Sequence, residues 1–269
     1  MKHIPSTLLL TALAGLAQLA RADDAPFLNA DPASVLGKGE MAVQSLNGVT
    51  HVDVGVTATN FFSQAEFDYG ITDKLQLATS VIYHWARVRE LGEPAESADF
   101  VGVEGELVWK LLDANDDLVG LALAGTTTIA PDYRGAVLRA LFTKYVSGFE
   151  NVLNIGFADR WLKLPLAGWI PFSDITINYG IAHPLNEHWQ IGAEFNSEFV
   201  FDGLWTSGNT HNGFGTFYVG PVAQYECKSV TVSVIALTEI PASFGSDVQH
   251  GLTPNADRWR IAIRLVHNL

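Results

Sequence analysis

Apolar and polar residues alternate over long stretches of this sequence, and this alternation constrains its fold more than any other feature. It is clear in the segment 75–86 (LQLATSVIYHWA), in 188–200 (HWQIGAEFNSEFV) and in the last twelve residues, 258–269. A period of two over nine to twelve residues predicts a β-strand with one apolar and one polar face. No apolar run approaches the roughly 18 residues that a transmembrane helix needs, once the first 22 residues are set aside.

The same pattern predicts an even number of strands, each about as long as a tilted strand that crosses a bilayer. Hydrophobic residues make up 48% of the chain and charged residues only 17%, against the roughly 25% charged that is typical of soluble domains. We therefore predict an all-β fold, a transmembrane antiparallel up-and-down β-barrel of about 12 strands. The predicted strands are 39–47, 58–69, 75–86, 99–110, 118–129, 136–146, 152–161, 174–182, 188–200, 214–225, 230–238 and 258–269.

The connections between these strands alternate in length, as in barrels with short periplasmic turns and longer outer loops. A soluble β-sandwich with its aromatic residues in the core is the alternative, but it requires neither this rhythm nor export. Aromatic residues near many strand ends favour two membrane-interface girdles. The predicted turns are 70–74, 111–117, 147–151, 183–187 and 226–229, and the predicted longer links are 86–98, 162–173, 201–213 and 238–257, with 130–135 as a short exception.

The N-terminus predicts export. Residues 1–22 have a basic start, an apolar stretch and the small-x-small sequence Ala20-Arg21-Ala22, which together are typical of a cleaved signal peptide. The mature domain would be 23–269, with 14 of the 16 basic residues left against 29 acidic ones, a formal charge of −15. This balance gives no reason to expect nucleic-acid binding. Cys227 is the only cysteine, so the chain cannot form an internal disulfide.

The C-terminus and the N-terminal signal together predict a location in the bacterial outer membrane. The chain ends on a strand that must close onto the first one, because an open edge in lipid leaves backbone groups unpaired. Its last residues resemble the signal read by the barrel-assembly machinery, although Leu269 stands where that signal usually has Phe or Trp. The expected partners are therefore outer-membrane lipid and, during biogenesis, the barrel-assembly machinery.

Two segments share the sequence Tyr-Gly-Ile before a polar turn: Tyr69-Gly70-Ile71 in the segment 67–77 and Tyr179-Gly180-Ile181 in the segment 177–191. The first continues Thr-Asp-Lys-Leu-Gln-Leu. In this it resembles the outer-membrane barrels grouped around the phenol-degradation meta-pathway proteins and their uncharacterised relatives. The second copy lacks Thr-Asp-Lys. The resemblance implies the barrel fold and a role in moving small, often hydrophobic compounds, and it supplies no functional residues.

Charged residues occupy the face that would line the lumen. They fit a charged pore that selects or holds a solute, and they equally fit a structural network whose opposite charges pair across a narrow barrel. The candidate lumen-lining residues are Glu66, Asp68, Glu104, Glu106, Glu194, Glu198, Arg139, Arg258, Arg260 and Arg264.

Three functional hypotheses follow. The leading one is a passive channel or transport barrel for small solutes, and the second is a structural or surface-binding barrel with a closed lumen. The third is a lipid-modifying enzyme, which would need a Ser or Thr within hydrogen-bond reach of a histidine at the outer face. No His-x-Ser pair occurs, so we predict no catalytic residues, and no pattern predicts a metal or a cofactor.

Overall fold

The computed structural model describes residues 26–53, 56–90, 96–164, 168–202, 214–240 and 257–269. The predicted signal peptide lies outside these residues and stays a prediction. No helix in the described part of the chain is long and apolar enough to cross a membrane.

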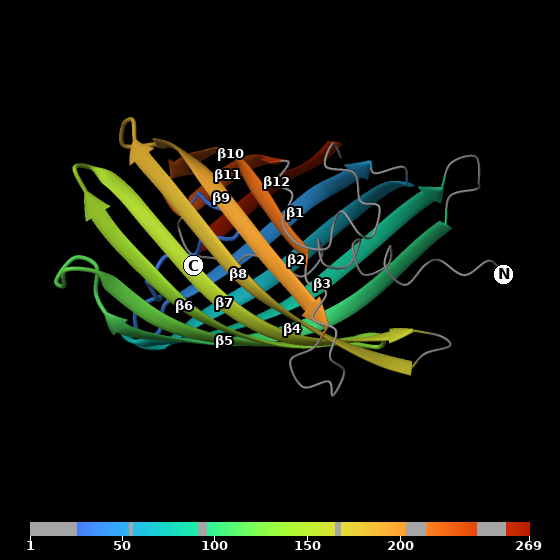
Figure 1. Ribbon diagram of the computed structural model, residues 1–269. Helices are drawn as coiled ribbons and strands as arrows, with labels where there is room; N and C mark the ends of the chain where they lie inside the picture. Colours follow the sequence, from blue (N-terminus) through green and yellow to red (C-terminus); the bar gives the residue numbers. More distant parts are fainter. Residues whose placement is uncertain (1–25, 54–55, 91–95, 165–167, 203–213, 241–256) are drawn as a thin grey trace.

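The structure is a closed antiparallel barrel of 12 strands in sequential order, which confirms the predicted fold class (Figure 1). The barrel closes because β1 pairs with both β2 and β12, from Ala42 opposite Asn268 to Asp53 opposite Asp257. The strands are β1 (Met41–Asp53), β2 (Val56–Thr72), β3 (Leu75–Glu90), β4 (Glu96–Leu112), β5 (Gly120–Ala130), β6 (Tyr133–Val146), β7 (Phe149–Leu164), β8 (Gly168–Pro184), β9 (Trp189–Asp202), β10 (Phe214–Cys227), β11 (Val230–Glu239) and β12 (Asp257–Asn268).

Several strands extend further than the sequence pattern predicts. The ladder between β3 and β4 continues to the pair Val88 and Glu96, and that between β7 and β8 reaches the pair Leu164 and Gly168. The predicted long links 86–98 and 162–173 are therefore largely strand. Backbone pairing can continue past the point where apolar alternation stops, because the ladder is built from main-chain groups. We call this end of the barrel the loop end, and the end with the short turns and both barrel termini the turn end.

The two faces of the wall differ as the alternation predicts. Burial alternates residue by residue, for example along the whole of β5. Large apolar side chains on the outer face are exposed, among them Val81, Val103 and Ile129. Aromatic residues stand on the outer face at the turn end, where Trp189 and Tyr225 pack with ring centroids 5.0 Å apart. An apolar exterior on a single closed sheet excludes the alternative of a soluble sandwich.

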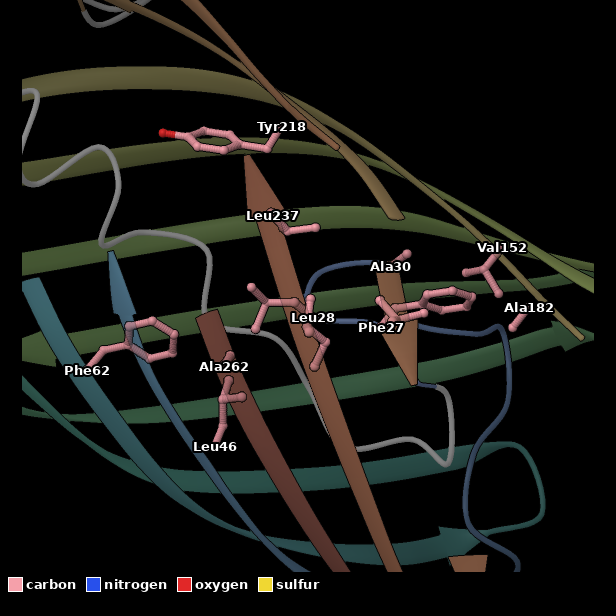
Figure 2. Close-up of a cluster of buried hydrophobic side chains, with 12 residues drawn as sticks. Phe27, Leu28, Ala30, Leu46, Phe62, Val152, Ala182, Tyr218, Leu237 and Ala262 are labelled. Atoms are coloured by element: carbon pink, nitrogen blue, oxygen red, sulfur yellow. The ribbon is translucent and has the colours of Figure 1, made fainter. Parts of the chain in front are cut away.

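The space enclosed by the wall contains part of the chain that lies before β1. We call residues 26–40 the N-terminal segment: every residue from 26 to 33 is buried inside the barrel, and residues 38–40 are exposed where the segment joins β1. Figure 2 shows Phe27, Leu28 and Ala30 of this segment inside the ring of strands, beside Val152 and Ala182 of the wall. Apolar–polar alternation predicts no element for residues 26–38, and the strand predicted from residue 39 begins at Met41, so this occupied lumen is a finding of the structure alone.

Candidate functional site

The N-terminal segment enters the barrel at the turn end, beside β2 and β3. The amide of Gly39 donates to the carbonyl of Gly70 at 2.8 Å, and the amide of Gly70 donates to the carbonyl of Glu40 at 3.0 Å. Three residues before Gly39, the Leu36 amide donates to the side-chain oxygen of Gln76 at 2.7 Å. These bonds fix the segment against one wall before it crosses the lumen.

The middle of the segment packs against β4, β5 and β6. The amide of Ala33 donates to the hydroxyl of Thr143 on β6 at 2.7 Å. Thr143 is an inward polar residue in an otherwise apolar stretch, and here it satisfies a main-chain donor that would be costly to bury alone. Small and apolar residues complete the contact: Ala33 clusters with Val108, Ala122, Ala124 and Leu141.

Asp31 is the charged centre of the segment. Its carboxylate is 2.7 Å from the guanidinium of Arg139 on β6 and 3.9 Å from that of Arg264 on β12. Because β6 and β12 are six strands apart in either direction around the ring of 12, these two arginines belong to opposite walls. Arg139 also forms an ion pair with Glu106 at 2.6 Å. Asp31 therefore links opposite sides of the barrel through one buried carboxylate.

The first described residues of the segment are held mainly by their main chain. Both oxygens of the Glu194 carboxylate on β9 accept hydrogen bonds, from the amides of Leu28 and Asn29, at 2.6 Å each. The carbonyl of Asn29 accepts from the side-chain amides of Asn154 at 3.1 Å and Asn178 at 3.2 Å. Polar side chains of the wall thus replace the partners that these backbone groups would have in a sheet or in water.

Two glycines of the wall make room for this segment. A β-carbon on Gly70 of β2 would lie 2.0 Å from the carbonyl oxygen of Gly37, and one on Gly180 of β8 would lie 2.6 Å from the ring of Phe27. β2 and β8 are also six strands apart. The segment therefore spans the lumen from one wall to the opposite one, and both glycines come from the Tyr-Gly-Ile sequences.

A second group of charges lies nearer the loop end and forms ion pairs within the wall. Arg160 on β7 forms an ion pair with Asp174 on β8 and lies 3.7 Å from Glu198 on β9. We call these three residues the wall triad. Beside them, Arg258 and Glu239 pair at 2.9 Å, and the Arg260 guanidinium lies 3.9 Å from the ring centroid of Tyr218.

Three further acidic residues on β2 and β4 accept hydrogen bonds from uncharged side chains of the wall. Glu66 accepts from Gln64 at 2.8 Å, Asp68 accepts from Gln76 at 3.2 Å, and Glu104 accepts from Thr128 at 2.8 Å. All ten predicted lumen-lining residues are buried or partly buried. Glu106, Arg139, Glu194 and Arg264 gather around the N-terminal segment, whereas the other six contact the wall. Their use by a passing solute remains a prediction.

Sequence reasoning missed the segment and the residues that hold it because its contacts are irregular. Residues 26–38 have no period of two or of 3.6, so the pattern that predicts the strands gives no signal there. A usable signal was the row of inward amides, Asn154, Asn178 and Asn196, next to an inward glycine at 180. Uncharged hydrogen-bonding groups and a missing side chain on one stretch of wall suit a main chain lying against it.

One histidine does have a hydroxyl within hydrogen-bond reach, as a lipid-modifying enzyme would require. The Nδ1 atom of His51 is 3.2 Å from the hydroxyl of Thr59, on the outer face near the loop end. The other contact of His51 in the described part of the chain is stacking on Trp259, with ring centroids 5.4 Å apart. A nucleophile and base need a third group to orient the imidazole, and among the described residues none does so here. The pair therefore fits an aromatic girdle better than a catalytic site.

The class that this geometry defines is a closed 12-strand barrel with an apolar exterior and an occupied lumen. An outer membrane channel from Pseudomonas putida F1 shares the fold, with a TM-score of 0.64 at 11% identity over 89% of this chain and 99% of that one. The translocator domain of the autotransporter NalP from Neisseria meningitidis matches with 0.55 at 10% identity, over 87% and 90%. The NanC porin matches with 0.52 at 6% identity, over 84% and 100%.

At these identities the likeness shows a shared fold, which is the fold that the Tyr-Gly-Ile resemblance implied. No protein-family model and no curated protein sequence matches the chain.

Proposed function

We propose that this protein is an outer-membrane channel for small solutes, and that its N-terminal segment closes the lumen in the resting state. The apolar exterior suits contact with membrane lipid, and the fold is shared with an outer membrane channel and a porin. The turn end would face the periplasm, as short turns do in this class of barrel. The protein would reach the membrane as an exported chain inserted by the barrel-assembly machinery.

The observation that carries the proposal is the way in which the segment is bound. Besides the apolar packing of Phe27 and Ala33, its deepest polar contacts with the wall are main-chain hydrogen bonds to side chains, such as Leu28 and Asn29 on Glu194, and one charged link through Asp31. Each is a contact that water can replace when the segment leaves, and the wall arginine Arg139 keeps a wall partner in Glu106. A segment held in this way can be displaced without opening the barrel wall.

A reversible cross-link tests the proposal. The amide of Ala33 lies 2.7 Å from the hydroxyl of Thr143, so Ala33→Cys with Thr143→Cys, in a Cys227→Ser background, brings two thiols close together. We expect the oxidised protein in planar bilayers to show no channel openings. Reduction with dithiothreitol should restore the openings of the unmodified protein, because the segment can then move again.

The matched controls are the two single-cysteine variants, which should conduct equally under oxidising and reducing conditions. The closed-lumen structural barrel is the competing hypothesis, and the paired charges of the wall favour it. A protein that is folded, as shown by heat-modifiable migration on gels, but never conducts even when the segment is released would establish that hypothesis and refute ours.

A further inference from the structure

We infer that the lumen contains a peptide-binding site, which the N-terminal segment occupies within its own chain and which short carboxylate-bearing peptides can occupy in its place. This deepens the proposed function, because it requires the segment to be displaceable and names the chemistry of what displaces it. The site is formed by the wall residues that contact residues 27–33.

The wall binds the main chain of the segment in an ordered series. Glu194 accepts from two successive amides, those of Leu28 and Asn29, and Asn154 and Asn178 donate to the carbonyl that follows. Two residues later, Arg139 and Arg264 flank the carboxylate of Asp31. Acceptors, then donors, then cations lie in the order in which an extended peptide presents amides, a carbonyl and an acidic side chain.

The same series discriminates against simpler solutes. An inorganic anion without protons, such as sulfate or chloride, offers no donor to the buried carboxylate of Glu194, which is 1% exposed, so only water can take the place of those two bonds. An apolar solute offers nothing to any of the three groups. Burying unpaired polar groups is costly, so the best-fitting ligands carry both amide groups and a carboxylate.

One part of the site selects by shape. The ring of Phe27 lies against Gly180, where a β-carbon would approach it to 2.6 Å, and it clusters with Val152 and Ala182. These small residues leave space for one aromatic or large apolar side chain, two positions before the carbonyl that Asn154 and Asn178 bind. The preferred peptide therefore carries, in order, a large apolar residue, an apolar residue, a polar residue that fits the buried position of Asn29, a small residue and an acidic residue.

The test uses the full-length chain with the substitution Asp31→Arg, which changes the segment and leaves every wall residue intact. Placing a third guanidinium beside Arg139 and Arg264 should expel the segment. The probe is a synthetic peptide with the sequence of residues 26–34, PFLNADPAS, and binding is measured by calorimetry in detergent and by block of conductance. The matched probes are the same peptide with Asn in place of its Asp, and a peptide of reversed sequence.

We expect the native peptide to bind Asp31→Arg about tenfold or more tightly than the Asn peptide, the ratio that one charge-assisted interaction provides. The reversed peptide should bind at least as poorly. The unsubstituted protein should also bind the native peptide at least about tenfold more weakly, because its own segment fills the site. Adding Glu194→Gln to Asp31→Arg should weaken the native peptide again.

The outcomes separate the two proposals. Equal binding of the native and reversed peptides, or no binding to an Asp31→Arg barrel that conducts freely, would overturn the peptide site and leave the channel standing. An Asp31→Arg barrel that stays closed, with its segment still protected from protease, would overturn both. Should Asp31→Arg fail to fold, Asp31→Asn repeats the test, since it removes the charge without adding a new one.

Discussion

The N-terminal segment's binding site and the wall triad use the same residue types for different purposes. Around the segment, Arg139 and Arg264 face the carboxylate of Asp31, which belongs to the segment and not to the wall. In the wall triad, Arg160 faces Asp174 and Glu198 of neighbouring strands. One set of charges therefore pairs with the N-terminal segment, and the other pairs between neighbouring strands of the wall.

This difference shows that a buried arginine in a barrel lumen does not by itself define a solute path. By sequence alone, the ten candidate lumen-lining residues fit either a charged pore or a structural network as one set, and the structure divides them. Each kind of pair has its own consequence: losing a triad residue should weaken the barrel, whereas losing a segment contact should open it. Substitutions in the two regions separate these consequences.

The largest loss of stability is expected from Arg160→Met. The substitution leaves Asp174 and Glu198 buried without their cation, and removing one partner of a buried pair costs about 3–5 kcal/mol. Urea unfolding of the protein in lipid vesicles measures this loss, and conductance should stay at its resting level. The control is the double variant Arg160→Met with Asp174→Asn, which should recover part of the stability. An open channel in Arg160→Met would remove the distinction between the two regions.

We expect the opposite result from Glu194→Gln: the channel should open more often, and the barrel should lose little stability. A glutamine has one acceptor oxygen, so either Leu28 or Asn29 loses its hydrogen bond and faces an amide donor instead. Hydrogen bonds to charged groups contribute about 1.5–3 kcal/mol, which corresponds to about a tenfold or greater rise in the open population. Single-channel recording measures the open fraction. Unfolding should change far less than in Arg160→Met, and an equal loss of stability would contradict the assignment.

Substitutions at the two inward glycines, Gly70 and Gly180, compare how firmly the two ends of the segment are held. Gly70→Ala places a methyl group against the backbone carbonyl of Gly37, which cannot move without shifting the segment, and we expect a cost of about 1–3 kcal/mol. Gly180→Ala meets the ring of Phe27, a side chain that can rotate, so its cost should be lower. Protease protection of residues 26–40 in the two variants ranks them. The reverse ranking would mean that the segment is anchored at β8 and not at β2.

The fold was largely predictable from the sequence because the alternation within each strand shows which residues face the lumen and which face outward. The alternation in 188–200 identifies Glu194 and Glu198 as inward residues without knowledge of any other strand, and the structure buries both. The strand ends were less predictable, since the ladder between β3 and β4 continues through the pair of Val88 and Glu96, beyond the predicted strand ends. Local pattern predicts orientation well and pairing length poorly.

The occupied lumen could not be predicted, because its contacts join residues far apart in the chain. Asn29 and Glu194 are 165 positions apart, and Ala33 and Thr143 are 110 apart. The Tyr-Gly-Ile sequences show which of their features local pattern predicts and which depend on a distant contact. Their tyrosines, Tyr69 and Tyr179, are exposed on the outer face as an interface residue would be. The reason for the glycine between Tyr and Ile appears only when the segment lies against it.

The smallest effect is expected where charges meet outside both regions, at the turn between β4 and β5. A hydrogen bond from the Lys110 ammonium, 2.9 Å away, is the main reason that the pKa of Asp113 lies below its usual value. A lowered folded pKa adds stability at pH values above the unfolded one. That contribution is lost as the pH falls through about 4 and below. Because Asp113 is about one-third exposed, Lys110→Met should cost less than about 1 kcal/mol.

Urea unfolding at pH 7 and pH 3 measures this contribution: the small difference between the variant and the unsubstituted protein should shrink at pH 3, with no change in conductance at either pH. A conductance change in Lys110→Met would mean that the turn itself takes part in closing the lumen, and the segment's binding site would then extend beyond residues 26–40 and the wall that holds them.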